Sequence, residues 1–303
     1  MNKSILLPVA ALMLMAACSS DNQSEQAMTD SGMAIKLQGS INGVTRANSN
    51  IQNDEFTEGT RVNVYINEIT NNTASAAKYT RPMVYTVNPS GSMAPTSRVY
   101  PYFPTSGNPV HIFATYPTNV TESTRSFTVE DEQDKSDKYK ASDLLYAEIE
   151  NLPNTTAEPT LQFYHKLSKI TVELVSGTGS PSLENAEVRL CNVYRTVSFD
   201  GSTGIVGGAS GSRSNVLVST NNNGARSAII PPQTVNPGYF IKIKLYSGDV
   251  IYYSLAQDRT FESGKAYRYI ITINKNGLEV AYDVEDWKNE TGNVSGGRPV
   301  IAE

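Results

Sequence analysis

The chain has 303 residues, two cysteines and two histidines, with a formal net charge of −5 and a pI near 5.3. Its basic residues are scattered rather than clustered, which argues against nucleic-acid binding. This composition does not supply the usual sets of catalytic or metal-ligating side chains, so we expect no enzyme, no metal site and no cofactor.

Residues 1–17 have the pattern of a secretion signal. Lys3 provides the positive start, and the apolar run over residues 5–15 is too short to cross a membrane as a helix. Small residues stand directly before Cys18, as a lipoprotein signal peptidase requires. We therefore predict a lipid on Cys18; the alternative is an ordinary cleaved signal with an incidental cysteine.

A polar tether and an amphipathic strand follow the signal. Residues 19–29 bury too little apolar surface to fold by themselves. Ile35, Leu37 and Ile41 then alternate with polar residues, which predicts a half-buried strand. Arg46 comes next among asparagine, glycine and serine residues, a composition typical of the exposed loops that proteases cut.

The body of the chain has the patterns of an all-β protein. Period-two alternation recurs, as in residues 61–66, 240–245 and 267–273, and glycine, proline, asparagine and serine punctuate the intervals. Many short strands with such turns predict β-sandwich architecture rather than an α/β fold.

The proline-rich and polar segment 151–159 separates two strand-rich parts. We therefore predict two sandwich domains in series, over residues 47–159 and 160–303. Residues 130–145 are charged and predict either a helix or a loop with a single turn. Residues 201–223 are rich in glycine, serine and asparagine and predict a long exposed loop.

The remaining cysteine and the two histidines are expected to be structural. If the sulfur of Cys18 carries lipid, Cys191 has no intramolecular disulfide partner, and its apolar context favours a small buried filler. His111 and His165 lie far apart in sequence, each within a strand-like run. Neither has a plausible catalytic partner in the sequence.

A second amphipathic strand is expected near the C-terminus. Its apolar face is formed by Leu278, Val280, Tyr282 and Val284. The last residues, including Val300 and Ile301, could extend from the body, although Pro299 lacks a ladder donor. The sequence gives nearly equal weight to the alternative, in which both terminal strands are ordinary strands of their own domains.

Several short patterns together resemble the fimbrillin family, the subunit-like proteins of major and minor fimbria in anaerobic Gram-negative bacteria. They occur in the expected order over nearly the whole chain, in residues 42–47, 56–65, 100–104, 110–117, 143–147, 161–170, 229–234 and 286–287. Phe56 and Thr60 depart from the Trp and the Gly-Asp that family members commonly have in this stretch.

The resemblance implies two transthyretin-like β-sandwich domains and assembly with other pilus subunits by strand exchange. The precursor would be an outer-membrane lipoprotein, and an arginine-specific processing protease would cut between Arg46 and Ala47. The lipidated tether and first strand, residues 18–46, would then leave. The opened groove would accept a strand from the C-terminus of another subunit, and the mature form would lie in a cell-surface fimbrium with a role in adhesion.

Two other functions stay open at this stage. One is a membrane-retained fimbrial anchor that keeps its lipid and is not cut after Arg46. The other is a surface glycan-binding lipoprotein, for which seventeen tyrosines and one tryptophan could supply sugar-stacking faces. The sequence leaves open the shaft, tip or anchor role, the protease, the adhesion ligand and the donor segment.

Overall fold

The computed structural model describes residues 32–41, 56–75, 79–220, 226–287 and 300–301. These residues are mostly in strands, with one short helix, α1 (Ser136–Ala141), so the prediction of a β-rich fold is confirmed. Cys18, Arg46 and Ala47 lie outside the described residues. No helix within the described ranges is long and apolar enough to cross a membrane.

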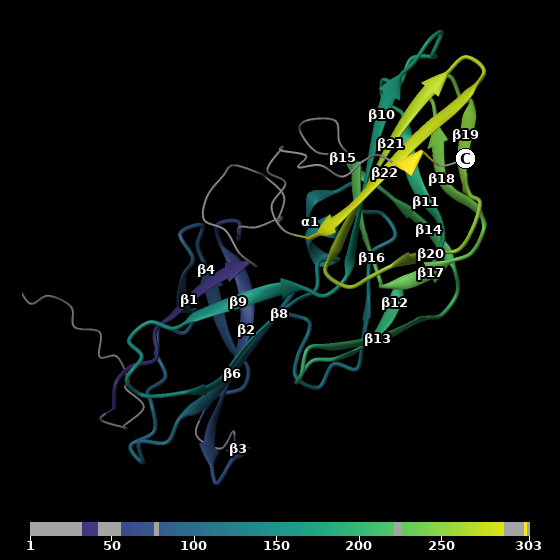
Figure 1. Ribbon diagram of the computed structural model, residues 1–303. Helices are drawn as coiled ribbons and strands as arrows, with labels where there is room; N and C mark the ends of the chain where they lie inside the picture. The colour runs from purple at the N-terminus through teal and green to yellow at the C-terminus, as the bar shows by residue number, and fades with distance from the viewer. Residues whose placement is uncertain (1–31, 42–55, 76–78, 221–225, 288–299, 302–303) are drawn as a thin grey trace, which may run out of the picture.

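The N-terminal half is an eight-stranded sheet in the order β3-β2-β4-β5-β1-β9-β8-β6 (Figure 1). Because β2 also pairs with β6, seven of these strands close into a ring around one apolar core, and β3 extends outside it. The strands are β1 (Leu37–Ile41), β2 (Thr60–Thr70), β3 (Thr73–Ser75), β4 (Met83–Val87), β5 (Ser92–Pro95), β6 (Val110–Tyr116), β8 (Leu145–Leu152) and β9 (Thr160–His165).

The C-terminal half packs a six-stranded sheet, β15-β16-β10-β21-β22-β23, against a four-stranded sheet, β14-β11-β18-β19. Alternate side chains of both sheets share the second core, as in a sandwich. The six strands are β10 (Ser168–Ser176), β15 (Ser219–Thr220), β16 (Arg226–Ile230), β21 (Lys265–Asn274), β22 (Gly277–Asp286) and β23 (Val300–Ile301). The four strands are β11 (Glu187–Val193), β14 (Ser214–Leu217), β18 (Gly238–Lys244) and β19 (Val250–Leu255).

Five shorter strands complete the fold. They are β7 (Ser126–Thr128), β12 (Thr196–Asp200) and β13 (Ile205–Ser210) in one sheet, and β17 (Gln233–Val235) with β20 (Arg259–Phe261) in another. β7 precedes the C-terminal half in the chain yet pairs with β12, which belongs to that half. The two halves are therefore joined by strand pairing as well as by the chain.

A third apolar cluster lies between the halves. It includes Tyr65 and Phe113 from the first sheet, Phe199 from the second half, and Trp287 near the end of the chain. The Trp287 indole stacks on the His165 imidazole with ring centroids 3.8 Å apart and planes 5° apart. These contacts fix the position at which the C-terminal tail leaves the body.

Strand β9 belongs to the first sheet, although the sequence predicts the boundary between the two domains before it, at residues 151–159. β9 pairs with β1 and β8, and its Leu161 and Phe163 are fully buried in the first core. By sheet membership, the change from one half to the other follows His165.

The prediction of one long loop over residues 201–223 is wrong. Strands β13, β14 and β15 occupy much of the part that the structure describes. Val216 and Val218 are buried in the second core. The prediction failed because glycine, serine and asparagine dominate the composition of the segment. The only helix in residues 130–145 is the six-residue α1, which packs on the body through buried Tyr139, and β8 begins at Leu145.

The two histidines provide a first test of the packing, because they sit in contrasting environments. His165 Nδ1 lies 2.8 Å from Asp143 Oδ1, and both side chains are 1% exposed, whereas His111 Nε2 lies 2.8 Å from the more exposed Glu148. We expect His165→Ala to lower the free energy of unfolding by about 3–5 kcal/mol, because it leaves the Asp143 carboxylate buried without its imidazole partner.

The matched change His111→Ala should cost about 1 kcal/mol or less, as expected for a pair near the surface. Chemical denaturation of both variants measures the difference. Equal losses, or a metal bound through either histidine in the purified protein, would contradict a purely structural role.

Candidate functional site: the first strand and the C-terminal sheet edge

Strand β1 closes the ring of the first sheet. It pairs antiparallel with β5 on one side and parallel with β9 on the other. The Gly39 amide donates to the Gly91 carbonyl at 2.7 Å, and the Gln38 amide donates to the Pro159 carbonyl at 3.0 Å. Without β1, the neighbouring strands β5 and β9 would each present unpaired N–H and C=O groups along an open edge.

The apolar face of β1 is fully inserted in the first core. Leu37 and Ile41 of β1, and Ile35 two residues before it, are 0–2% exposed. Burying three aliphatic side chains of this size stabilises the fold by roughly 5–9 kcal/mol relative to leaving them in water. Removal of this segment would therefore uncover a groove that is both apolar and lined by unpaired backbone groups.

The same face contains one position where only a small residue fits. A Cβ atom added to Gly39 would lie 2.9 Å from Met93 Sδ and 3.5 Å from the Phe56 ring. Phe56 is itself held edge-on against Phe163, with ring centroids 5.1 Å apart. The inner face of residues 35–41 thus has large side chains at positions 35, 37 and 41 and none at position 39.

The Gly39→Val variant tests this constraint. We expect it to lower the free energy of unfolding by about 1–3 kcal/mol, because the added side chain must displace Met93 or Phe56 from a packed core. Ser40→Val places the same side chain at the adjacent position on the opposite face and serves as the control. Thermal or urea unfolding measures the stability of both variants. Equal losses for Gly39→Val and Ser40→Val would contradict a lack of space for a side chain at residue 39.

The predicted C-terminal strand is β22, at the edge of the six-stranded sheet. It pairs with β21 in ten consecutive residue pairs, from Lys265↔Asp286 to Asn274↔Gly277. Leu278, Val280 and Tyr282 pack against the second core, whereas Val284 is 42% exposed. On its other side β22 carries only β23, through the pairs Ala281↔Ile301 and Tyr282↔Val300.

Side chains from other strands hold β22 in its own sandwich. The Arg259 guanidinium lies over the Tyr282 ring, 4.0 Å from its centroid. The same ring stacks on Tyr269 with centroids 5.9 Å apart, and burial raises the pKa of Tyr269 above its usual range. Moving β22 to another subunit would break all these contacts, whereas the backbone pairing of β23 with β22 that moving β23 would break spans two residue pairs.

The two terminal segments lie in different halves of the molecule. Figure 1 shows β1 in the N-terminal ring and β22 with β23 on the far half, where the sequence ends. A contact in which one end of a subunit binds the opposite end of the next is heterologous, and it produces an open filament when its rotation does not close a ring. The sequence patterns identified the inner face of β1, but they gave no sign of the closed ring, the pairing with β9 or the restriction at Gly39.

Comparisons with known proteins agree with this architecture. The sequence model of a family described as Fimbrillin-like matches residues 45–287. A relative from Bacteroides uniformis, named "Putative fimbrium subunit Fim1C", is 24% identical over 96% of this chain and 99% of its own length.

Two solved structures share the fold. A crystal structure described as a "putative cell adhesion protein" from Bacteroides uniformis superposes with a TM-score of 0.68 at 21% identity, covering 86% of this chain and 100% of that one. A protein of the same description from Bacteroides ovatus has a TM-score of 0.66 at 21% identity and the same coverage.

Proposed function

The chain belongs to the Fimbrillin-like family, and from this we propose that it is a structural subunit of a cell-surface fimbrium with a role in adhesion. The family is structural and non-enzymatic, so the chain is not an enzyme. A relative of nearly the same length is named as a fimbrium subunit, which supports an assembly with other pilus subunits.

The observation that carries the proposal is the position of β1. An N-terminal segment completes a closed ring, and the sequence that follows it contains the Thr45-Arg46-Ala47 pattern. We propose that the precursor is exported as a lipoprotein through Cys18 and cut between Arg46 and Ala47. The segment 18–46 then leaves, and the groove between β5 and β9 accepts a strand from a neighbouring subunit.

Physical chemistry supplies the driving force for that exchange. The opened groove exposes apolar side chains of the first core and two edges with unpaired backbone groups. An incoming strand restores the hydrogen-bond ladder and covers the core, which is how strand addition gains its affinity.

The contacts of β22 favour the tail after Trp287 as the donor. β22 is paired along its whole length and clamped by Arg259, whereas Val300 and Ile301 are held by two residue pairs at a sheet edge. We therefore propose that the tail is donated while Leu278, Val280, Tyr282 and Val284 stay in their own sandwich.

The mass of the chain, measured separately in sheared surface fibres and in the membrane fraction, tests whether it is lipidated and then cut after Arg46. Chain from sheared surface fibres should begin at Ala47, and the membrane-bound precursor should carry acyl chains on Cys18. Full-length lipidated chain found only in the membrane would instead support the anchor function. Absence from fibres and from the outer membrane would remove the fimbrial proposal.

A further inference from the structure

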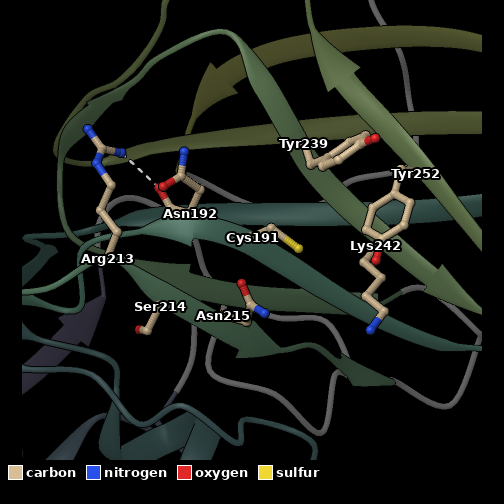
Figure 2. Close-up of a pocket in the computed structure, with 8 residues that line it drawn as sticks. All are labelled: Cys191, Asn192, Arg213, Ser214, Asn215, Tyr239, Lys242 and Tyr252. Carbon is tan, nitrogen blue, oxygen red and sulfur yellow. Dashed lines mark hydrogen bonds between the residues drawn. The ribbon is translucent and has the colours of Figure 1, made fainter.

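A pocket of about 420 Å³ lies on the outer face of the four-stranded sheet, and none of its lining residues belongs to β1 or β22 (Figure 2). Its floor and walls come from β11, β14, β18 and β19 and from the residue that precedes β14. The lining residues are Cys191, Asn192, Arg213, Ser214, Asn215, Tyr239, Lys242 and Tyr252. Its volume is within the range of small-molecule sites.

One wall of the pocket is aromatic and open to solvent. The rings of Tyr239 and Tyr252 lie on adjacent strands with centroids 4.5 Å apart, and they are 63% and 41% exposed as residues. Exposed large apolar side chains gather on this hairpin, since Tyr246 and Val250 are exposed there as well. Such a concentration of uncovered aromatic surface is typical of a binding site rather than of a packed sheet face.

The opposite end holds a fixed guanidinium. Arg213 donates from Nη1 to the Asn192 carbonyl at 2.7 Å and from Nη2 to the Thr234 carbonyl at 3.2 Å. The same group lies over the Tyr194 ring, 4.4 Å from its centroid. A guanidinium has five N–H donors, so these two bonds leave others for a ligand in a preset direction.

A second cation lies beside the aromatic wall. Figure 2 shows the Lys242 side chain next to Tyr252, and no ion pair of Lys242 occurs within the part of the chain that the structure describes. Burial raises the pKa of the Cys191 thiol at the pocket floor, while the Lys242 charge opposes that rise. No carboxylate lines the pocket, so it is locally cationic on a chain of net charge −5.

We propose that this pocket binds a carboxylate-bearing sugar residue of a glycan. The polarised C–H face of the sugar ring would pack on Tyr239 and Tyr252, and its carboxylate would accept a hydrogen bond from Lys242 beside them. Arg213, at the other end of the pocket, would donate to a neighbouring residue of the glycan. The exposed amide of Asn215 would meet a ring hydroxyl. A neutral sugar would use the aromatic wall but leave the Lys242 ammonium beside it without a counter-charge, which is why the acidic class is preferred.

An acidic glycan would be the ligand of the adhesion role proposed above, and its binding to the pocket does not require strand exchange. Calorimetry or ligand-observed NMR on the purified protein would use 3′-sialyllactose and trigalacturonic acid, with lactose and maltotriose as neutral counterparts. We expect at least one acidic probe to bind about tenfold or more tightly than its neutral counterpart. The preferred probe distinguishes sialylated glycans from uronate polysaccharides.

Matched variants separate the pocket from the surrounding surface. Tyr252→Ala and Lys242→Gln should each weaken binding about tenfold. Tyr246→Ala removes an exposed tyrosine from the same hairpin outside the pocket, and Lys244→Gln removes a charge two residues along β18. Both controls should bind within about twofold of the unaltered protein, as distant surface changes do.

Three results would overturn the inference: equal affinity for acidic and neutral probes, no saturable binding up to on the order of 10 mM, or equal losses in pocket and control variants. Binding should persist in Arg46→Ala, which is expected not to polymerise. A failure of the pocket is therefore distinguishable from a failure of the assembly proposal.

Discussion

Cells that carry the Arg46→Ala variant are expected to lack fibres built from this subunit, although the precursor still folds and reaches the membrane. The reason is the position of β1 inside the first ring, where Ile35, Leu37 and Ile41 are buried and both edges of the strand are paired. An uncut strand keeps its groove filled, so no strand of a neighbour can enter.

The expected effect is a loss of assembly without a loss of stability. Arg46 follows the buried residues Ile35, Leu37 and Ile41 in the sequence, so we expect its replacement to leave their core contacts intact. Electron microscopy of surface fibres and the mass of the chain measure the two parts of the prediction. The variant chain should be found at precursor mass in the membrane, with a thermal unfolding midpoint like that of the unaltered precursor.

Arg61→Ala is the matched control, because it removes an exposed arginine from the outer face of β2 in the same half of the molecule. It should leave both processing and fibres unchanged. Fibres of normal length from Arg46→Ala cells would remove cleavage from the account and leave the anchor or glycan-binding functions ahead.

Local sequence patterns were sufficient where apolar and polar residues alternate regularly, because a half-buried strand then shows its period of two directly. The inner face of β1 was predicted in this way, and its three apolar residues are buried. The partners of β1 were not predictable, since β9 lies more than one hundred residues away and nothing local specifies a parallel pairing. The closed ring follows only from those distant pairings.

Composition misled where few residues define the buried face. Residues 201–223 look like a loop because polar and small residues dominate, yet Val216 and Val218 are buried in the second core. The number of tyrosines in the sequence does not show which of them are exposed. Tyr85 and Tyr269 are fully buried, whereas Tyr239 and Tyr252 are exposed.

The candidate donor residues, too, were predicted as a strand from the sequence but could not be assigned a role from it. The alternation at residues 278–284 predicted a strand, but only the structure shows the Arg259 guanidinium over Tyr282 and the length of the pairing with β21. From the sequence alone, β22 and the tail after Trp287 are equivalent candidates for the donated strand. The tertiary contacts hold β22 in its own sandwich, so we expect deletion of the tail to stop donation.

Deletion of residues 288–303, with Trp287 retained, is expected to give a subunit that ends fibres. Trp287 stays stacked on His165, so the body should fold, and the chain should still be cut after Arg46 and accept a strand. Without the tail it has nothing to donate. Expressed alone it should form no fibres, and mixed with the unaltered subunit it should shorten them in proportion to its share.

A charge-matched pair of variants tests the same point without a deletion. Val300→Asp with Ile301→Asp places two charges on the apolar residues of β23, whereas Asn289→Asp with Asn293→Asp adds the same two charges at polar positions of the tail. The first pair should block donation, because an aspartate cannot enter an apolar groove without a large desolvation cost. The second pair should assemble normally, as measured by fibre length in electron micrographs.

If β22 is the donor instead, the outcome reverses. The tail deletion and both tail variants would then form fibres of normal length, and Tyr282→Ala would block assembly while leaving a stable monomer. If β22 stays in its own sandwich, Tyr282→Ala should lower the monomer's free energy of unfolding by about 2–4 kcal/mol, because Arg259 and Tyr269 lose the ring between them. Urea unfolding of that variant, beside the fibre lengths of the tail variants, identifies the donated segment.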